Sequence, residues 1–139
     1  MKEFLNNLKS LDLGFNSLSA IEPNILVHLS NLEQLVLSSN QIVTISSGVF
    51  KSLDNLERLD LNSNLISFVE KNEFRDMTTL FRLNLKKNKL QFLDSNIIQG
   101  CTNLKFFCLN ANLISNTSSL NFNGLSNLNQ NAVLDPVYC

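Results

Sequence analysis

Histidine, cysteine and glycine are scarce in this chain, and their scarcity excludes several kinds of functional site. The 139 residues include one histidine, three cysteines and four glycines. A single histidine, His28, rules out multi-histidine metal sites and most catalytic sets that depend on histidine. The sequence also has neither a glycine-rich phosphate loop nor a metal-ligand spacing. We therefore expect no enzymatic activity, no metal and no cofactor.

The charge and the hydropathy of the chain exclude two further classes of partner. The net charge is −1, so no overall positive field draws the chain to nucleic acid or to an anionic membrane. No apolar run approaches the roughly 18 residues that a membrane span requires. The first ten residues also lack the apolar stretch of a secretory signal. We expect one domain, with no nucleic-acid partner and no direct membrane insertion of this segment.

A period of 24 residues accounts for almost every leucine. In each unit, positions one, four, six, eleven, nineteen and twenty-two are apolar, and position nine is always asparagine. Position fourteen is apolar too, except at Thr117. The units begin at Leu8, Leu32, Leu56, Leu80 and Leu104, and their asparagines are Asn16, Asn40, Asn64, Asn88 and Asn112. The pattern LxxLxLxxNxL therefore occurs five times between residues 8 and 127.

The spacing predicts one short parallel strand per unit. Alternation around positions four and six buries two side chains and turns positions three, five and seven outward. The longer remainder of each unit needs more room, so the stack is expected to curve with its sheet inside. Asparagine follows the strand, where its amide can satisfy turn backbone groups that stacking buries. We interpret the asparagine column as a structural ladder.

These units resemble the leucine-rich-repeat family, and the resemblance covers residues 8–127. The 24-residue period, with Phe50 and Phe74 at position nineteen, is similar to the extracellular repeats of Toll-like receptors and lamprey variable lymphocyte receptors. The resemblance implies an α/β fold. This would be a curved leucine-rich-repeat solenoid with a parallel sheet on the concave face and an irregular or short-helical convex face.

Both ends of the chain depart from the five complete units. Residues 1–7 fit the tail of a truncated preceding repeat, since Leu5 falls on position twenty-two, and we expect the chain to be a fragment. Residues 128–139 form a degenerate repeat, because Asn131 occupies position four. Asp135, Pro136 and Cys139 resemble the opening of the cysteine-rich C-terminal cap of extracellular family members, although Asp135 replaces an asparagine. A chance ending is the alternative.

The cysteines and the one glycosylation sequon carry less information. Cys101 lies in a buried column and is predicted to pack as a small apolar residue. Cys108 lies at the outward position five, so we expect a surface thiol that faces away from Cys101 and forms no bridge to it. A reactive thiol or a ligand contact is the alternative for Cys108. The use of the sequon at Asn116 and the bonding of Cys139 stay open.

The outward columns vary where the buried columns do not, so they hold the candidate ligand-binding residues. Positive charge gathers in the third and fourth units beside an exposed aromatic residue, a composition frequent in binding hot spots. Ordinary solvated strand residues are the alternative. The predicted ligand-binding residues on the concave face are Arg58, Asp60, Arg82, Asn84, Lys86 and Phe106.

Two phenylalanines mark a second surface. Phe68 and Phe92 occupy position thirteen of adjacent units, so they should lie along one edge of the stack. Half-buried packing beneath the outer segment is one interpretation. A lateral contact with a partner, such as a homodimer, is the other.

The sequence thus predicts a protein-binding recognition module. We expect a fragment of an extracellular or cell-surface leucine-rich-repeat receptor, or of a secreted protein, whose concave sheet contacts a protein ligand. An innate-immune role rests on the resemblance alone. The alternative is an intracellular leucine-rich-repeat scaffold or regulatory subunit. The ligand, the length of the parent protein and the oligomeric state are not fixed by the sequence.

Overall fold

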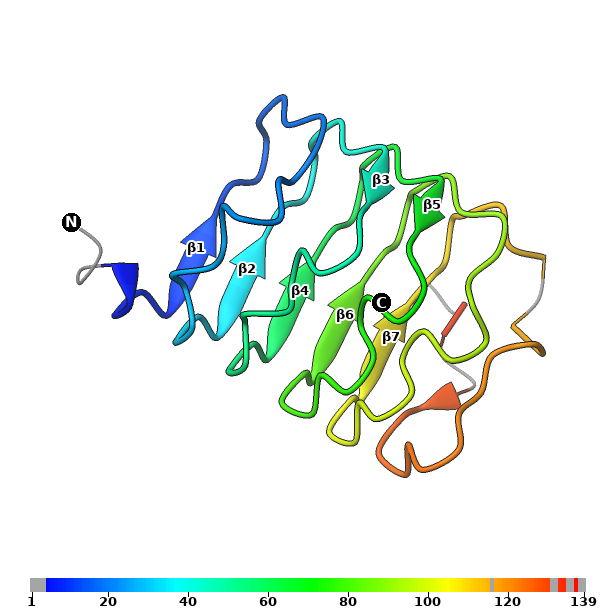
Figure 1. Ribbon diagram of the computed structural model, residues 1–139. Coiled ribbons are helices and arrows are strands. Elements are labelled where there is room, and N and C mark those ends of the chain that lie inside the picture. The colour runs from blue at the N-terminus through cyan, green and yellow to red at the C-terminus, as the bar shows by residue number, and fades with distance from the viewer. Residues whose placement is uncertain (1–4, 116, 131–132, 135–136, 138–139) are drawn as a thin grey trace.

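The chain winds as a solenoid, and a parallel sheet forms one of its walls (Figure 1). The computed structural model describes residues 5–115, 117–130, 133–134 and 137. Each of the five units contributes one strand at positions three to five, which confirms the predicted fold. The strands are β1 (Ser10–Asp12), β2 (Gln34–Val36), β4 (Arg58–Asp60), β6 (Arg82–Asn84) and β7 (Phe106–Cys108). Their order in the sheet is β1-β2-β4-β6-β7.

The pairing register follows the 24-residue period without a slip. Leu11 pairs with Leu35, and Leu83 pairs with Phe107, so position four stacks on position four throughout the sheet. Because side chains alternate along a strand, the outward positions three and five also form straight columns. The register therefore decides which exposed side chains become neighbours. We call the surface formed by these outward columns the sheet face.

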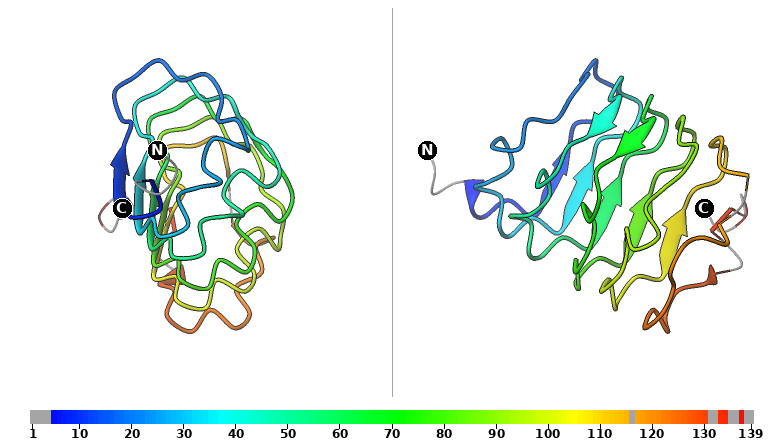
Figure 2. Two further views of the ribbon diagram at one scale, coloured as in Figure 1. Left: turned by 60° about the vertical axis from the view of Figure 1, so that its left-hand side comes forward. Right: turned by 45° about the vertical axis from the view of Figure 1, so that its right-hand side comes forward.

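The opposite wall consists mainly of turns (Figure 2). On the flank that joins the sheet to this wall, two short strands, β3 (Thr44–Ile45) and β5 (Phe68–Val69), pair in parallel as a second sheet (Figure 1). The described residues contain almost no helix, so this wall is of the irregular kind rather than the short-helical kind.

The core lies between these two walls and is formed by the repeated apolar columns. Leu32, Leu56, Leu80 and Leu104 at position one are fully buried. Leu8 of the first unit packs against the core from the end of the stack and is only half-buried. Burying an aliphatic side chain of this size contributes about 1.5–3 kcal/mol.

The described part of residues 128–139 forms a partial sixth turn. Leu128 and Val133 are buried against the last complete unit. The backbone N–H of Leu109 donates to the carbonyl of Val133 at 2.8 Å. The equivalent N–H of Leu85 donates to Cys108, so the acceptor in the sixth turn comes one residue later than the period requires. This shift is consistent with the degenerate pattern, whereas Asn131, Asp135, Pro136 and Cys139 lie outside the described residues.

Position eight of every unit has a left-handed backbone, although no unit has glycine there. The φ angles of Phe15, Ser39, Ser63, Lys87 and Ala111 lie between 53° and 57°. This conformation turns the chain out of the strand and toward the asparagine at position nine. A residue with a Cβ pays a steric cost of about 1–2 kcal/mol in the left-handed region.

Replacing Ala111 with glycine is therefore expected to raise the free energy of unfolding by about 0.5–1 kcal/mol, since glycine removes this cost but gains entropy when unfolded. Thermal and urea unfolding measure the change. Ala20→Gly is the matched control, because Ala20 is exposed and is not among the residues with positive φ. The control should be destabilised. A loss of stability in Ala111→Gly would contradict the backbone assignment.

Candidate functional site

The asparagines at position nine fasten each unit to the one before it. The amide nitrogen of Asn64 donates to the carbonyls of Leu61 at 3.1 Å and Leu37 at 2.9 Å, and its oxygen accepts from the N–H of Ile42 at 3.1 Å. Asn40 and Asn88 repeat these contacts one period away in either direction. The side-chain amides of these asparagines are thus occupied by hydrogen bonds to backbone groups.

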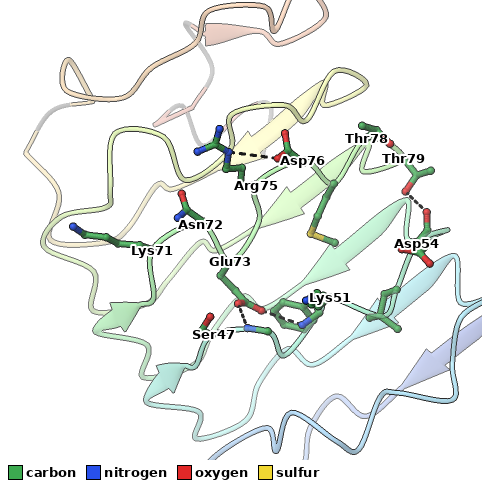
Figure 3. Close-up of a pocket in the computed structure, with 14 residues that line it drawn as sticks. Ser47, Lys51, Asp54, Lys71, Asn72, Glu73, Arg75, Asp76, Thr78 and Thr79 are labelled. Carbon is green, nitrogen blue, oxygen red and sulfur yellow. Dashed lines mark hydrogen bonds and ion pairs between the residues drawn. The ribbon is translucent and has the colours of Figure 1, made fainter.

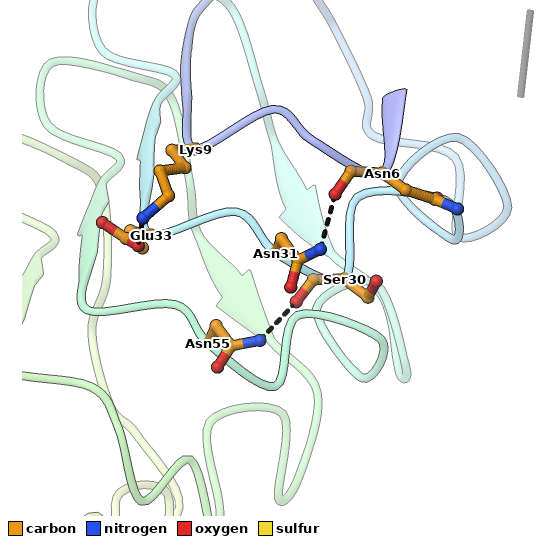
Figure 4. A network of polar contacts seen from close by, with 6 residues as sticks. All are labelled: Asn6, Lys9, Ser30, Asn31, Glu33 and Asn55. Atoms are coloured by element: carbon orange, nitrogen blue, oxygen red, sulfur yellow. Dashed lines mark hydrogen bonds and ion pairs between the residues drawn. The ribbon is translucent and has the colours of Figure 1, made fainter. Parts of the chain in front are cut away.

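A second ladder runs along the edge that precedes the strands (Figure 4). The amide of Asn31 donates to the carbonyl of Asn6 at 2.6 Å, and that of Asn55 donates to Ser30 at 2.8 Å. Beside them, Lys9 Nζ and Glu33 Oε1 form an ion pair at 2.7 Å, which raises the pKa of Lys9. The two ladders hold both ends of the strands without using the outward side chains at position three.

One column of the sheet face brings together three of the predicted ligand-binding residues. Arg58 pairs with Arg82, and Arg82 pairs with Phe106. Arg58 is exposed, while the other two are half-buried. The guanidinium carbon of Arg82 lies 5.3 Å from the centre of the Phe106 ring, within cation–π range.

The neighbouring column offers less surface. Asp60 is half-buried, and its Oδ1 accepts from the backbone and side-chain amides of Asn62 at 3.0 and 2.7 Å. Asn84 is buried, and its Oδ1 accepts from the N–H of Lys86, which is itself half-buried. Asn84 therefore supports the turn after β6 and exposes little surface. A shallow hollow of about 230 Å³ lies between the two columns over β2, β4 and β6.

Two residues that the sequence analysis did not select complete an aromatic and cationic cluster at the edge of the sheet. Phe81 and Lys105 occupy position two, just before β6 and β7. The rings of Phe81 and Phe106 meet edge to face, with centres 5.5 Å apart. Lys105 Nζ lies 6.0 Å from the Phe81 ring and 5.5 Å from the Phe106 ring. The sequence feature that could have identified this cluster is the change at position two. This position is Glu33 and Glu57 in the second and third units, but Phe81 and Lys105 in the fourth and fifth.

Cys108 is not the surface thiol that was predicted. It is fully buried and disulfide-bonded. The expectation failed because burial at position five increases along the sheet, from the exposed Asp12 to the buried Asn84 and Cys108, and the period alone does not encode that change. Cys101 is a free buried thiol, as predicted, so the two cysteines are not bridged. Its Sγ donates to the carbonyl of Phe74 at 2.8 Å, and burial raises its pKa to about 12.

The two phenylalanines at position thirteen lie on the flank that follows the asparagine ladder. Phe68 is 39% exposed and Phe92 is 66% exposed, so half-buried packing does not describe Phe92. Val43, Leu65 and Leu113 are exposed apolar residues of the same flank. A lateral contact through this flank stays a prediction.

A buried carboxylate lies on the turn-rich wall (Figure 3). Glu73 occupies position eighteen, where the adjacent units have the buried Val49 and Ile97. Its two oxygens accept from the N–H groups of Gly48 at 2.6 Å and Phe50 at 3.0 Å. Burial raises the pKa of Glu73, and these hydrogen bonds offset part of the rise. A hollow of about 520 Å³ adjoins Glu73. The carboxylate oxygens are nevertheless occupied by their hydrogen bonds to the turn of the preceding unit.

Raising the pH is expected to lower the stability of the protein relative to a Glu73→Gln variant. The carboxyl has a higher pKa in the folded state than in the unfolded state. Its contribution is therefore present at low pH and is lost as the pH rises through the folded-state pKa. Thermal unfolding of both proteins from about pH 4 to about pH 8 covers that window. A difference in Tm that is constant with pH, or that changes in the opposite sense, would refute the buried carboxylate.

Within the described part of the chain, no cluster of three histidine, cysteine or acidic residues has the geometry of a metal site. No helix there has the length and apolar character needed to cross a membrane.

Comparisons with known proteins match both the repeat and the fold. A sequence profile of the family described as Leucine rich repeat matches residues 3–42, 30–90 and 54–114. A search of curated proteins gives no match.

Two solved structures are similar to this chain. The TLR13 chain of a TLR13–ssRNA13 complex is 29% identical over 87% of this chain, with a TM-score of 0.80. The leucine-rich-repeat protein LIC12759 of Leptospira interrogans is 28% identical over 92% of this chain, with a TM-score of 0.77. This chain spans only 18% and 32% of the lengths of those chains.

Proposed function

Because this chain belongs to the leucine-rich-repeat family, whose domains generally act as protein-interaction modules, we propose that it is a protein-binding recognition module. Its ligand contacts the sheet face over β4, β6 and β7. The whole protein is an extracellular or cell-surface receptor, or a secreted protein.

The observation that carries the proposal is the contact between Arg82 and Phe106 in a column that the repeat otherwise leaves variable. The buried columns and the asparagine ladder are fully used by the fold, whereas these two side chains have no role in the core. Arginine is enriched in interface hot spots, and its planar guanidinium can lie against an aromatic ring while its hydrogen-bond donors remain available to a ligand.

The disulfide at Cys108 supports the extracellular part of the proposal, because disulfides persist in oxidising compartments and are rare in the cytosol. The likeness to TLR13 supports a receptor with an immune role. That protein was solved with single-stranded RNA, and cations beside aromatic rings also suit single strands. Binding of RNA is therefore measured beside binding of protein.

Affinity capture from matched extracellular and cytosolic protein pools tests the proposal. The baits are the wild-type chain and a variant with Arg58→Ala, Arg82→Ala and Phe106→Ala. Circular dichroism and gel filtration must first show that both baits are folded. We expect a partner from the extracellular pool that the variant captures at least about tenfold less well, since hot-spot residues each contribute about 2 kcal/mol.

A second bait controls for non-specific loss of binding. Phe68→Ser and Phe92→Ser alter the flank and leave the sheet face intact, so this variant should capture the partner as the wild type does. Capture from the cytosolic pool alone would favour the intracellular scaffold. Capture that is indifferent to the three sheet-face substitutions would refute the proposed site.

A further inference from the structure

We infer that a hollow at the edge of β6 and β7 receives an acidic segment of the protein partner, in which carboxylates flank an apolar side chain. The hollow measures about 540 Å³, and its lining includes Glu57, Arg58, Phe81 and Lys105. This inference rests on the proposed function, because it specifies the partner chemistry of the same surface.

The position of the hollow connects it to the sheet face. Phe81 and Lys105 lie at position two, and Arg58 is the first residue of β4. Phe81 reaches the sheet face through its contact with the ring of Phe106. A bound segment therefore touches the edge hollow and the Arg82–Phe106 contact at the same time. The hollow extends the site beyond the outward strand columns.

The charges around the hollow are unbalanced. Among the described residues, Lys9 is paired with Glu33 and Arg75 with Asp76, whereas Arg58, Arg82 and Lys105 form no ion pair. Arg82 and Lys105 lie beside the rings, and Arg58 lines the same hollow as Phe81, in a chain whose net charge is −1. A concentration of unpaired positive charge against the overall charge of the chain indicates an anionic partner at this place.

The rings of Phe81 and Phe106 indicate which kind of side chain lies next to the carboxylate of the bound segment. Phe81 and Phe106 are each half-buried, so part of each ring stays open to an apolar side chain of the partner. Lys105 Nζ lies over both rings and still has ammonium hydrogens directed away from them. A carboxylate bound there accepts a charge-assisted hydrogen bond, while the neighbouring apolar side chain packs on the rings. A peptide with an aromatic residue between acidic residues has this combination.

Glu57 provides an internal control for the sign of the charge on the ligand. Its carboxylate is exposed and lies on the same lining as Arg58 and Lys105. It repels an acidic ligand that the two cations attract. Neutralising Glu57 and neutralising Lys105 should therefore change the affinity for an acidic segment in opposite directions.

Nuclear magnetic resonance titration of the ¹⁵N-labelled chain tests the inference. The probe is the blocked peptide Asp-Glu-Phe-Asp-Glu. Three matched probes are Asp-Glu-Ala-Asp-Glu, Lys-Arg-Phe-Lys-Arg and a short oligouridine RNA. We expect the first peptide to shift the backbone amides of Phe81, Lys105 and Phe106 and to bind more tightly than the other three.

The variants supply the expected changes in affinity. Lys105→Gln should weaken binding of the acidic peptide about threefold, and Glu57→Gln should strengthen it about twofold, as for a partly solvated ion pair. Both sites are exposed, so both variants should keep the fold. Equal binding of the basic peptide, tighter binding of the RNA, or no shift at these three amides would overturn the inference.

The capture experiment distinguishes a failure of the inference about an acidic segment from a failure of the proposed function. If the acidic peptide does not bind but the sheet-face variant still loses its extracellular partner, the inference about acidity falls and the proposed function stands. If the sheet-face variant captures the partner normally, the proposed site falls as well.

Discussion

Asn64→Ala is expected to lower the free energy of unfolding by about 3 kcal/mol or more. The side chain is buried and is held between the backbones of two adjacent units. Alanine would leave the N–H of Ile42 and the carbonyl of Leu37 without this partner inside the protein. Each buried polar group left unsatisfied costs about 1–3 kcal/mol. Urea unfolding followed by circular dichroism gives the change.

Asn16→Ala is the matched control at the same position of the first unit. Asn16 is exposed, and among the described residues it donates to the carbonyls of Leu13 and Gly14 alone, within its own turn. Its removal should cost less than about 1 kcal/mol, because water replaces the lost hydrogen bonds. Equal losses in the two variants would contradict the view that the ladder acts by bridging units.

Breaking the disulfide of Cys108 is expected to lower the free energy of unfolding by about 2–4 kcal/mol. The bond restricts the unfolded chain, and Cys108 is fully buried at the end of β7. The Cys108→Ser variant adds the cost of a buried hydroxyl group. Thermal unfolding of the wild-type chain with and without a reducing agent measures the effect of the bond alone.

The reductant itself is controlled with the variant. Cys108→Ser should unfold at the same temperature with and without the reducing agent, because the remaining described cysteine, Cys101, is already a free thiol. A wild-type Tm that does not fall on reduction would contradict the structural role of the disulfide. It would also remove the main support for an oxidising compartment.

The repeated columns of the fold could be predicted from the sequence because each depends on burial or on a strand period. Leu35 and Leu59 are buried and paired where the alternation requires, and five strands occur at positions three to five. The hydrogen bonds of Asn40 also match what an amide after a strand can satisfy. Such features recur with the period, so each unit reinforces the assignment of the others.

The features that the sequence did not reveal are those in which one unit differs from the rest. Glu73 replaces an aliphatic side chain and accepts hydrogen bonds that only the three-dimensional turn of the preceding unit provides. Cys108 is buried and disulfide-bonded at a position that the strand alternation turns outward, which a repeat alignment does not encode. Phe81 and Lys105 became part of the candidate site through ring contacts across adjacent units. The ligand-binding roles of Arg58, Asp60, Arg82, Asn84, Lys86 and Phe106 stay predictions.

Photo-crosslinking from two phenylalanine positions tests the central claim, that the sheet face binds the partner. Benzoylphenylalanine replaces Phe106 on the sheet face in one chain and Phe92 on the exposed flank in another, so the two probes are chemically identical. Each chain is irradiated in the pool from which the partner is captured. The account predicts a covalent adduct with the partner from position 106 and none from position 92. An adduct from position 92 alone would contradict it and would assign binding to the flank.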